Sequence, residues 1–224
     1  MENDISLITV LALASLAPFL IACGTCYIKF SIVFVMIRNA IGLQQIPSNM
    51  TLNGIAFIMS AFVMMPVMKD SYDYYQNNNP GWRSSDEMAN FVSEGFSGYK
   101  DYLTRYTDPE LAAFFESAQR SQLKEVDDTQ ATVEIDEEHE PSLLALLPAY
   151  ALSEIKDAFK IGFYIYLPFV VVDMLISSIL LTLGMMMMSP VTISVPIKLL
   201  LFVALDGWTL VTQGLIGQYM SVGG

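Results

Sequence analysis

Apolar residues fill long runs that are separated by one polar block. Residues 5–28 contain no Asp, Glu, Lys or Arg, and a helix of that length is about 36 Å long, enough to cross the roughly 30 Å hydrocarbon core of a bilayer. Residues 39–68 are also uncharged. They open with turn-prone residues around Pro47 and predict a second hydrophobic helix from about Met50 to Met68.

The first apolar run predicts a permanent helix and not a cleaved signal peptide. The four residues at the start of the chain, MEND, are acidic, whereas a signal peptide begins with basic residues. Pro18 lies in the middle of the run and predicts a kink there. We expect this helix to remain attached to the rest of the chain.

The last third of the chain predicts a helical hairpin. Residues 161–197 contain one charged side chain, Asp173, and residues 199–224 contain one, Asp206. Between the two predicted helices, residues 184–196 include one glycine and two prolines and predict a turn region, marked by Gly184, Pro190 and Pro196. The two apolar helices are therefore expected to run antiparallel, with a group of methionines near the tip of the hairpin.

The polar block between the apolar runs predicts two short helices. It begins at Lys69 with a loop-like stretch, KDSYDYYQNNNPGW, and Asp86 and Glu87 suit the start of the first helix. Thr107 and Glu110 match a capping box for the second helix, with a proline, Pro109, at an early helical position. The block ends at Glu140 in an acidic stretch without aromatic residues, which predicts a flexible linker.

Charge and composition sharpen this division. The chain of 224 residues is 54% hydrophobic yet carries a net charge of −12, and residues 69–140 hold 17 of the 23 acidic side chains but only 6 of the 11 basic ones. We therefore predict an all-α fold, with membrane-type hydrophobic helical hairpins and an inserted small helical acidic domain. The predicted segments are residues 1–68, 69–140 and 141–224.

Several classes of chemistry are excluded by the same inventory. An acidic chain has no basic patch to neutralise nucleic-acid phosphates, so no nucleic acid is expected as a partner. The one histidine, His139, lies in the acidic run EIDEEHE and fits a solvated linker. Cys23 and Cys26 form a CxxC motif inside an apolar run, where packing in a helix is a simpler interpretation than redox work. No cofactor, metal site or catalytic residue is predicted.

Charged residues within the hydrophobic helices are the first candidates for function, because each of them needs a partner. Asp173 lies 12 residues before Met185, and Lys198 lies 12 residues after Met186. In a symmetric hairpin the two side chains would be level and would form an ion pair, within one chain or between copies. The alternative is that Lys198 reaches a polar surface while Asp173 bonds locally.

The run of four methionines at the predicted turn is the second candidate, made up of Met185, Met186, Met187 and Met188. Four consecutive residues of a helix could not all face one partner, but at a turn they can converge. Methionine is unbranched and deformable, so such a cluster can close around different shapes. In a ring of identical copies these turns would form a hydrophobic constriction that seals a pore. The alternative is a role in packing alone.

Three long strings resemble the FliP/SctR family of core export-apparatus proteins of bacterial type III secretion, in its injectisome branch. They are KFSIVFVMIRNAIGLQQIPSNMTLNG at residues 29–54, LLPAYALSEIKDAFKIGFYIYLPFVVVDM at 146–174 and LGMMMMSPVTISVPIKLLLFVALDGW at 183–208. The resemblance covers essentially the whole chain, and it is weakest in residues 69–140.

The resemblance implies a non-enzymatic subunit of a protein-export gate in the bacterial inner membrane. It implies assembly of several copies, described as five, with S-type and T-type export subunits and other needle-base components, and passage of secreted unfolded proteins. It assigns the gasket to Met185, Met186 and Met187, with Met188 adjacent, and places Asp173 and Lys198 between neighbouring subunits. Further candidate subunit contacts are Glu154, Lys156 and Lys160.

Orientation and the rival functions stay open at the level of sequence. Basic residues are divided three against four between the two sides of the predicted helices, so the positive-inside rule does not decide the orientation. A large acidic block opposite short loops without acidic residues favours a block on the periplasmic side. The rival function is an ion-coupled transporter or channel with Asp173 and Asp206 as coupling carboxylates, against which stands the absence of a detectable internal repeat. A membrane enzyme lacks a visible nucleophile and base.

Overall fold

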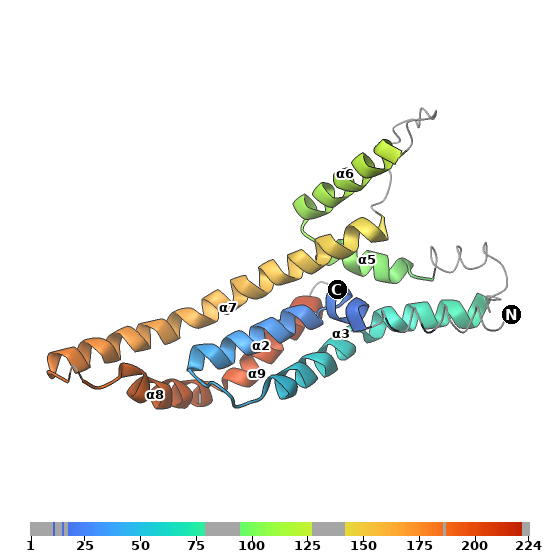
Figure 1. Cartoon of the computed structure of the whole chain (residues 1–224). Coiled ribbons are helices and arrows are strands. Elements are labelled where there is room, and N and C mark those ends of the chain that lie inside the picture. Colours follow the sequence, from blue (N-terminus) through green and yellow to red (C-terminus); the bar gives the residue numbers. More distant parts are fainter. Residues whose placement is uncertain are drawn as a thin grey trace. The chain divides into compact units, whose positions relative to one another are not determined.

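The computed structural model describes residues 11, 15, 18–78, 95–126, 142–185 and 187–220, and every regular element within these ranges is a helix (Figure 1). The predicted all-α fold is thereby confirmed for the described part of the chain. The first continuous described stretch is the helical segment Pro18–Gly24, and Leu11 and Ser15 before it are also helical. The following helices are α2 (Tyr27–Ile41), α3 (Asn49–Asn78), α5 (Ser97–Tyr106), α6 (Pro109–Val126), α7 (Leu143–Thr182), α8 (Pro190–Ala204) and α9 (Gly207–Met220).

The helices group into two compact units. Unit 1 consists of Met1–Cys26 and Met64–Glu154, and unit 2 consists of Tyr27–Val63 and Ile155–Gly224. The long helices α3 and α7 therefore contribute to both units. The functional segments expected at residues 1–68, 69–140 and 141–224 remain a prediction from sequence.

The region around α2 departs from the sequence prediction. The helix expected through Ile28 stops at Gly24, and a separate helix, α2, begins at Tyr27 and includes both Lys29 and Arg38. Its buried apolar residues recur at helical spacing and form one stripe that packs inside unit 2, to which α2 belongs: Phe30, Val33, Phe34, Ile37 and Ile41. The sequence analysis took only uncharged runs as hydrophobic helices. It therefore missed α2, which contains two basic residues that are buried in unit 2. The predicted kink at Pro18 falls at the first residue of the described helix and is left untested.

Helix α3 is longer than predicted. Ser48 caps its start, since the Ser48 Oγ accepts a hydrogen bond from the Thr51 N–H at 3.2 Å. The helix continues ten residues beyond Met68, through the stretch after Lys69 that predicted a loop. This prediction was wrong for residues 69–78, whose polar side chains are compatible with a helix, and its part at Pro80 and Gly81 lies outside the described residues. The Ser71 Oγ, for example, donates to the Val67 carbonyl at 3.4 Å.

The helices α5 and α6 of unit 1 meet at a short turn. As predicted, Pro109 is the first residue of α6. The cap is Asp108 and not Thr107, because the Asp108 Oδ1 accepts from the Glu110 N–H at 3.0 Å, whereas the Thr107 hydroxyl donates to the Leu103 carbonyl at 2.6 Å. The predicted helix start at Asp86 and Glu87, the acidic linker and His139 lie outside the described residues.

The predicted glycine turn after α7 is confirmed. Gly184 has a φ of +71°, its N–H donates to the Leu181 carbonyl at 3.1 Å, and the Met185 N–H donates to the Leu180 carbonyl at 3.0 Å. These two bonds are the Schellman pattern that ends a helix at a left-handed residue. Helix α8 then begins at Pro190, where a proline needs no hydrogen-bond acceptor for its nitrogen.

The turn is shorter than the predicted region 184–196. Pro196 lies inside α8, which continues to Ala204. One side of this helix is anchored by three buried residues four positions apart, Ser194, Lys198 and Phe202. We attribute the survival of the helix across Pro196 to this packing, which offsets the loss of one backbone hydrogen bond.

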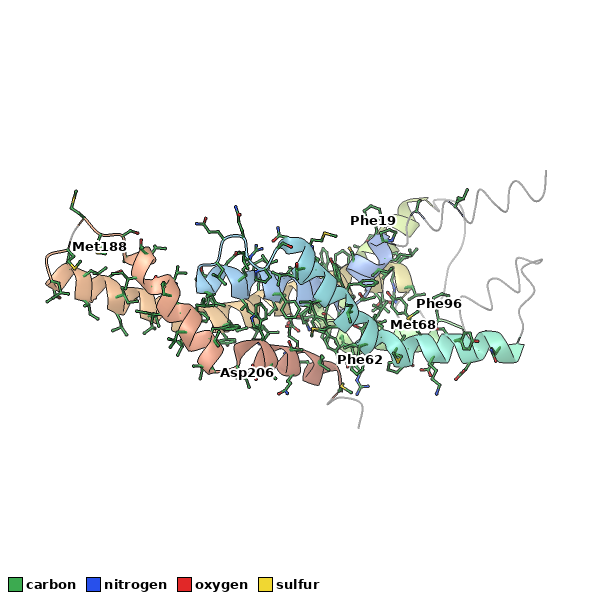
Figure 2. The ribbon with its side chains drawn as sticks, turned by 90° about the horizontal axis from the view of Figure 1, so that it is seen from below. Phe19, Phe62, Met68, Phe96, Met188 and Asp206 are labelled. Carbon is green, nitrogen blue, oxygen red and sulfur yellow. The ribbon has the colours of Figure 1, made fainter. Side chains whose placement is uncertain are left out.

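Asp206 forms the corner between α8 and α9, which are bent by 59° (Figure 2). It is the only described non-glycine residue with a positive φ, at 50°. Its N–H donates to the Val203 carbonyl at 3.0 Å, and its Oδ1 accepts from the Thr209 hydroxyl at 3.0 Å. Gly207 follows because a Cβ there would lie 2.3 Å from the Phe202 ring. Asp206 therefore ends one helix and caps the next.

Two of the described helices are long and apolar enough to cross a membrane. They are Asn49–Tyr74 and Leu143–Thr182, and up to four spans are counted if each pair of bent helices is one span. Within their most apolar stretches, only 28% and 17% of residues respectively are buried inside the protein. Most of this apolar surface therefore needs cover from outside the chain.

Candidate functional site

The methionine turn presents its side chains outward. Met187 is fully exposed, at 102% of its reference area, and Met185 and Met188 are about half exposed, at 40% and 45%. The Met188 N–H donates to the Met185 carbonyl at 3.2 Å and so closes the turn. Figure 2 shows Met188 at the end of the α7–α8 hairpin. Met186 lies outside the described residues.

Below this turn, Asp173 of α7 and Lys198 of α8 form an ion pair. The Lys198 Nζ lies 2.5 Å from the Asp173 Oδ2, and the lysine side chain is 7% exposed whereas the aspartate side chain is 41% exposed. The lysine ammonium is thus almost inaccessible to solvent, while the aspartate carboxylate remains partly accessible to it. The pair joins the two arms of the hairpin and fixes their register, because both charges would be costly to leave without partners in an apolar setting.

The same lysine connects α8 to the end of α2. Its Nζ lies 3.4 Å from the Ala40 carbonyl oxygen. Nearby, Gly42 ends α2 with a φ of +91°, and a Cβ at this position would lie 2.7 Å from the Val195 side chain. A glycine is therefore required for both the backbone conformation and the close approach of α8.

Lys29 of α2 is a second buried cation. The sequence analysis did not predict that it packs inside the protein. It is 3% exposed, and its Nζ lies 3.5 Å from the Asp157 Oδ2 of α7. The ammonium also lies 4.9 Å from the centre of the Tyr219 ring of α9, within the range of a cation–π interaction. Lys29 thereby ties three helices of unit 2 together. An isolated lysine in an apolar run is the signal that could have identified it.

Arg38 is the third cation held inside unit 2. Its side chain is buried, and the Nη1 donates to the Pro47 carbonyl at 3.1 Å. This bond links the last turn of α2 to the loop before α3. Each basic residue of α2 and α8 is therefore used to connect separate segments of the chain.

The three further predicted subunit contacts have different surroundings. Lys156 and Lys160 are exposed on α7, as a contact with another copy would require. Glu154 is fully buried within unit 1. A contact of these three residues with another copy stays a prediction.

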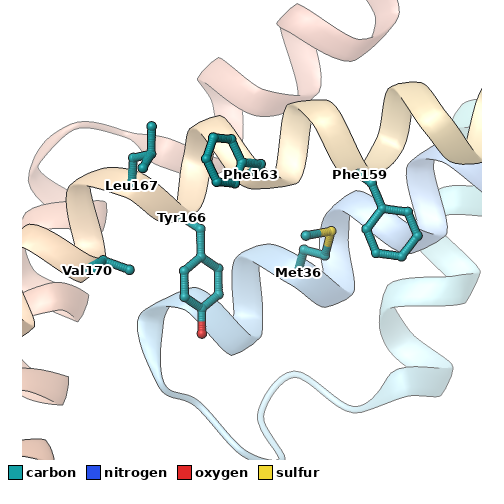
Figure 3. Close-up of a pocket in the computed structure, with 6 residues that line it drawn as sticks. All are labelled: Met36, Phe159, Phe163, Tyr166, Leu167 and Val170. Atoms are coloured by element: carbon teal, nitrogen blue, oxygen red, sulfur yellow. The ribbon is translucent and has the colours of Figure 1, made fainter.

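An apolar groove of about 380 Å³ lies between α2 and α7 in unit 2 (Figure 3). Met36 lines it on the side of α2, and the α7 side is lined by Phe159, Phe163, Tyr166, Leu167 and Val170. At one end Gly162 lets the two helices approach, since a Cβ there would lie 2.3 Å from the Met36 sulfur. The groove adds to the apolar surface that the chain itself leaves uncovered.

Unit 1 contains a set of buried hydroxyl groups on α5 and α7. The Tyr102 and Tyr150 hydroxyl oxygens lie 2.6 Å apart, and the Ser153 Oγ accepts from the Asp108 N–H at 2.8 Å. Burial raises the pKa of Tyr99 to about 12, and burial together with the nearby Cys26 raises the pKa of Tyr102. These phenols are therefore neutral hydrogen-bonding groups at physiological pH.

The described residues offer little to metal or redox chemistry. They contain no group of three or more His, Cys, Asp or Glu side chains placed to hold a metal ion. Cys23 and Cys26 are both reduced, with the first thiol exposed and the second buried. Within the described ranges, the prominent polar features are thus ion pairs and hydrogen bonds that connect helices.

Comparison with known proteins gives long and specific matches. A family model described as the FliP family matches residues 8–215. The chain is 61% identical to the surface presentation of antigens protein SpaP of Salmonella typhimurium, over 99% of both chains. It is 44% identical to the Yop proteins translocation protein R of Yersinia pestis, over 98% of both, and 39% identical to the harpin secretion protein HrcR of Erwinia amylovora, over 92% of both.

Proposed function

We propose that this chain, which belongs to the FliP family, is a subunit of the type III secretion export gate in the bacterial inner membrane. The names of its relatives, which refer to surface presentation of antigens, translocation of Yop proteins and secretion of harpin, support a role in protein secretion. Several copies, five by the family resemblance, form the entry pore for unfolded protein substrates together with S-type and T-type export subunits and other needle-base components.

The uncovered apolar surface supports an assembly of this kind. Only 17% of the most apolar stretch of α7 is buried within the chain. Apolar surface of this extent is favoured in contact with lipid or with other apolar helices. In the proposed assembly, neighbouring copies cover part of it and the membrane covers the rest. The acidic block of residues 69–140 then lies on the periplasmic side.

The observation that carries the proposal is the exposure of the methionines at the tip of the hairpin. A monomer gains nothing from a fully exposed Met187, but a ring of such turns places deformable apolar side chains around one axis. A constriction of this kind excludes water and ions by dewetting, and it can yield to an unfolded chain because methionine side chains adapt their shape.

In this proposal the charged residues are structural and the protein is not an enzyme. Asp173 is already engaged by Lys198 at 2.5 Å, and its open side faces outward for a contact with a neighbouring copy. Asp206 caps α9. A carboxylate that couples ion transport must be free to gain and lose a cation, so these engagements favour the gate over the transporter.

The gasket is tested by replacing Met185, Met186 and Met187 together with alanine in the complete export complex. We expect the complex to assemble and the membrane to become leaky to small ions, measured as single-channel conductance in planar bilayers. The matched control is Met50→Ala, because Met50 is an exposed methionine (88%) at the start of α3. A triple variant that assembles and stays as ion-tight as the control would refute the gasket.

A further inference from the structure

The first apolar segment is interrupted between Gly24 and Tyr27. The helix Pro18–Gly24 ends there, and α2 begins at Tyr27 after a break of two residues. In a continuous helix the Gly24 carbonyl would accept a hydrogen bond from the Ile28 N–H. Where a helix stops, its last carbonyls lose such partners and need others, above all in apolar surroundings.

Two hydroxyl groups donate to backbone carbonyls at this break. The Thr25 Oγ1 donates to the Ile21 carbonyl at 2.6 Å. The Tyr99 Oη donates to the Gly24 carbonyl at 2.8 Å, from a position 75 residues away in the chain. The carbonyl at the end of the first helix is thus satisfied by a side chain of α5, which belongs to the acidic block.

The site is shaped to admit this hydroxyl. A Cβ at Gly24 would lie 2.3 Å from the Tyr99 Oη, so no other residue leaves room for the bond. The Tyr99 ring is held in place by stacking on Tyr102, with ring centres 6.4 Å apart and planes 14° apart. Phe96 packs against its edge at 6.5 Å. The hydroxyl is therefore aimed at the break by the packing of α5.

We propose that Tyr99 is a positioning residue with which the acidic block ends the first apolar helix at Gly24. Without its hydroxyl, the Gly24 carbonyl bonds to the Ile28 N–H and the helix continues through residues 25 and 26 into α2. Docking of α5 thereby selects the interrupted form of the segment, independently of whether the methionine turn seals a pore.

Hydrogen exchange of the full-length protein in mild detergent tests this proposal. Tyr99→Phe removes the hydroxyl and keeps the ring that stacks on Tyr102. We expect the Ile28 amide to exchange more slowly by about tenfold or more, because its N–H then bonds to the Gly24 carbonyl. The matched control is Tyr72→Phe, which removes an exposed hydroxyl of unit 1 that bonds to Gln76. Unchanged or faster exchange of the Ile28 amide in Tyr99→Phe would overturn the proposal.

A second test uses the close approach of the two groups. Gly24→Ala places a methyl group against the Tyr99 hydroxyl and should lower the thermal midpoint. In the Tyr99→Phe background the obstructing oxygen is gone, and the added Cβ has its nearest remaining contact at 3.4 Å, the Leu147 side chain. We expect the double variant to match Tyr99→Phe alone. An equal loss from Gly24→Ala in both backgrounds would contradict a direct contact at the break.

Discussion

The two units of this protein satisfy their buried polar groups in different ways. Unit 1 buries the carboxylate of Glu154, but its contact between α5 and α7 is made by neutral hydroxyls, as in the pair Tyr102–Tyr150 at 2.6 Å. Unit 2 uses buried cations, with Lys29 and Lys198 each paired to an aspartate of α7. A neutral hydroxyl costs little to bury once it is hydrogen-bonded, whereas a buried ammonium depends on its counter-charge. The stability of unit 2 should therefore respond most strongly to loss of a carboxylate, and the stability of unit 1 to loss of a tyrosine hydroxyl group.

The largest expected effect is that of removing Asp173. Asp173→Leu leaves Lys198 buried with only the Ala40 carbonyl at 3.4 Å, and should lower the free energy of unfolding by about 3 kcal/mol. Lys198→Met should cost less, about 1 kcal/mol, because the Asp173 side chain is 41% exposed and can be hydrated. The measurement is denaturant unfolding in mild detergent, with hydrogen exchange at α8 to locate the loss.

The double variant Asp173→Leu with Lys198→Met supplies the control for this pair. It removes both charges, so its stability should return to within about 1 kcal/mol of the original protein. Equal losses in the two single variants, or additive losses in the double variant, would show that the burial of Lys198 does not determine the response of unit 2.

The next effect tests the tight apolar packing of unit 2. Gly207→Ala forces a Cβ into the Phe202 ring, which also packs edge-on against Trp208 at 5.3 Å. We expect a loss of about 2 kcal/mol. The control is Gly214→Ala in the same helix, α9, where a Cβ has nothing within 4 Å and should stabilise the helix by about 0.5 kcal/mol. Similar midpoints for the two variants in thermal unfolding would be evidence against the close packing at Gly207.

A smaller effect is expected in unit 1 from the buried tyrosine pair. Tyr102→Phe or Tyr150→Phe removes one hydroxyl from a buried hydrogen bond and should cost about 1.5 kcal/mol. Since each variant breaks the same bond, the double variant should cost clearly less than the sum of the two. Hydrogen exchange at α5 and at the start of α7 measures the loss. Additive effects would mean that the two hydroxyls act independently.

The smallest predicted effect is a loss of unit 1 stability at high pH. In folded unit 1 the Tyr99 pKa is raised by burial to about 12, from an ordinary value of 10.0. Between these values the unfolded chain has already released the proton, so stability is intact below pH 10 and falls as the pH rises. At pH 11 the Tyr99 contribution to this loss is about 1 kcal/mol, and Tyr102, whose pKa is also raised by burial, adds to the total loss measured by hydrogen exchange at α5. The loss should be smaller in Tyr99→Phe, and an identical loss in that variant would assign it to other groups.

The sequence predicted those features that depend on neighbours along the chain. Gly184 and Pro190 bound the turn after α7 as expected, because a left-handed residue and a proline act on the local backbone. Pro109 likewise begins α6. The positions of Asp173 and Lys198 follow from the length of the hairpin arms, so their proximity could be expected once the turn had been located.

The features that were missed depend on partners far away in the chain. Lys29 was treated as the end of an apolar run, yet it is buried and forms an ion pair with Asp157, which lies 128 residues further along the chain. The break after Gly24 uses Tyr99, 75 residues away. No local pattern identifies such partners. The extension of α3 past Met68 was missed because polar residues were taken to mark a loop, although polarity alone does not end a helix.

The most direct test of the gate is whether the methionine turns of different copies meet. In a chain with Cys23 and Cys26 replaced by alanine, Met187→Cys should give disulfide-linked dimers when the assembled complex is treated with a mild oxidant, because Met187 is fully exposed at the tip of the hairpin. The exposed control Met50→Cys should give none. Dimers at position 187 are the result that we predict. Their absence from an intact, oxidised complex would contradict a gate built from converging methionine turns.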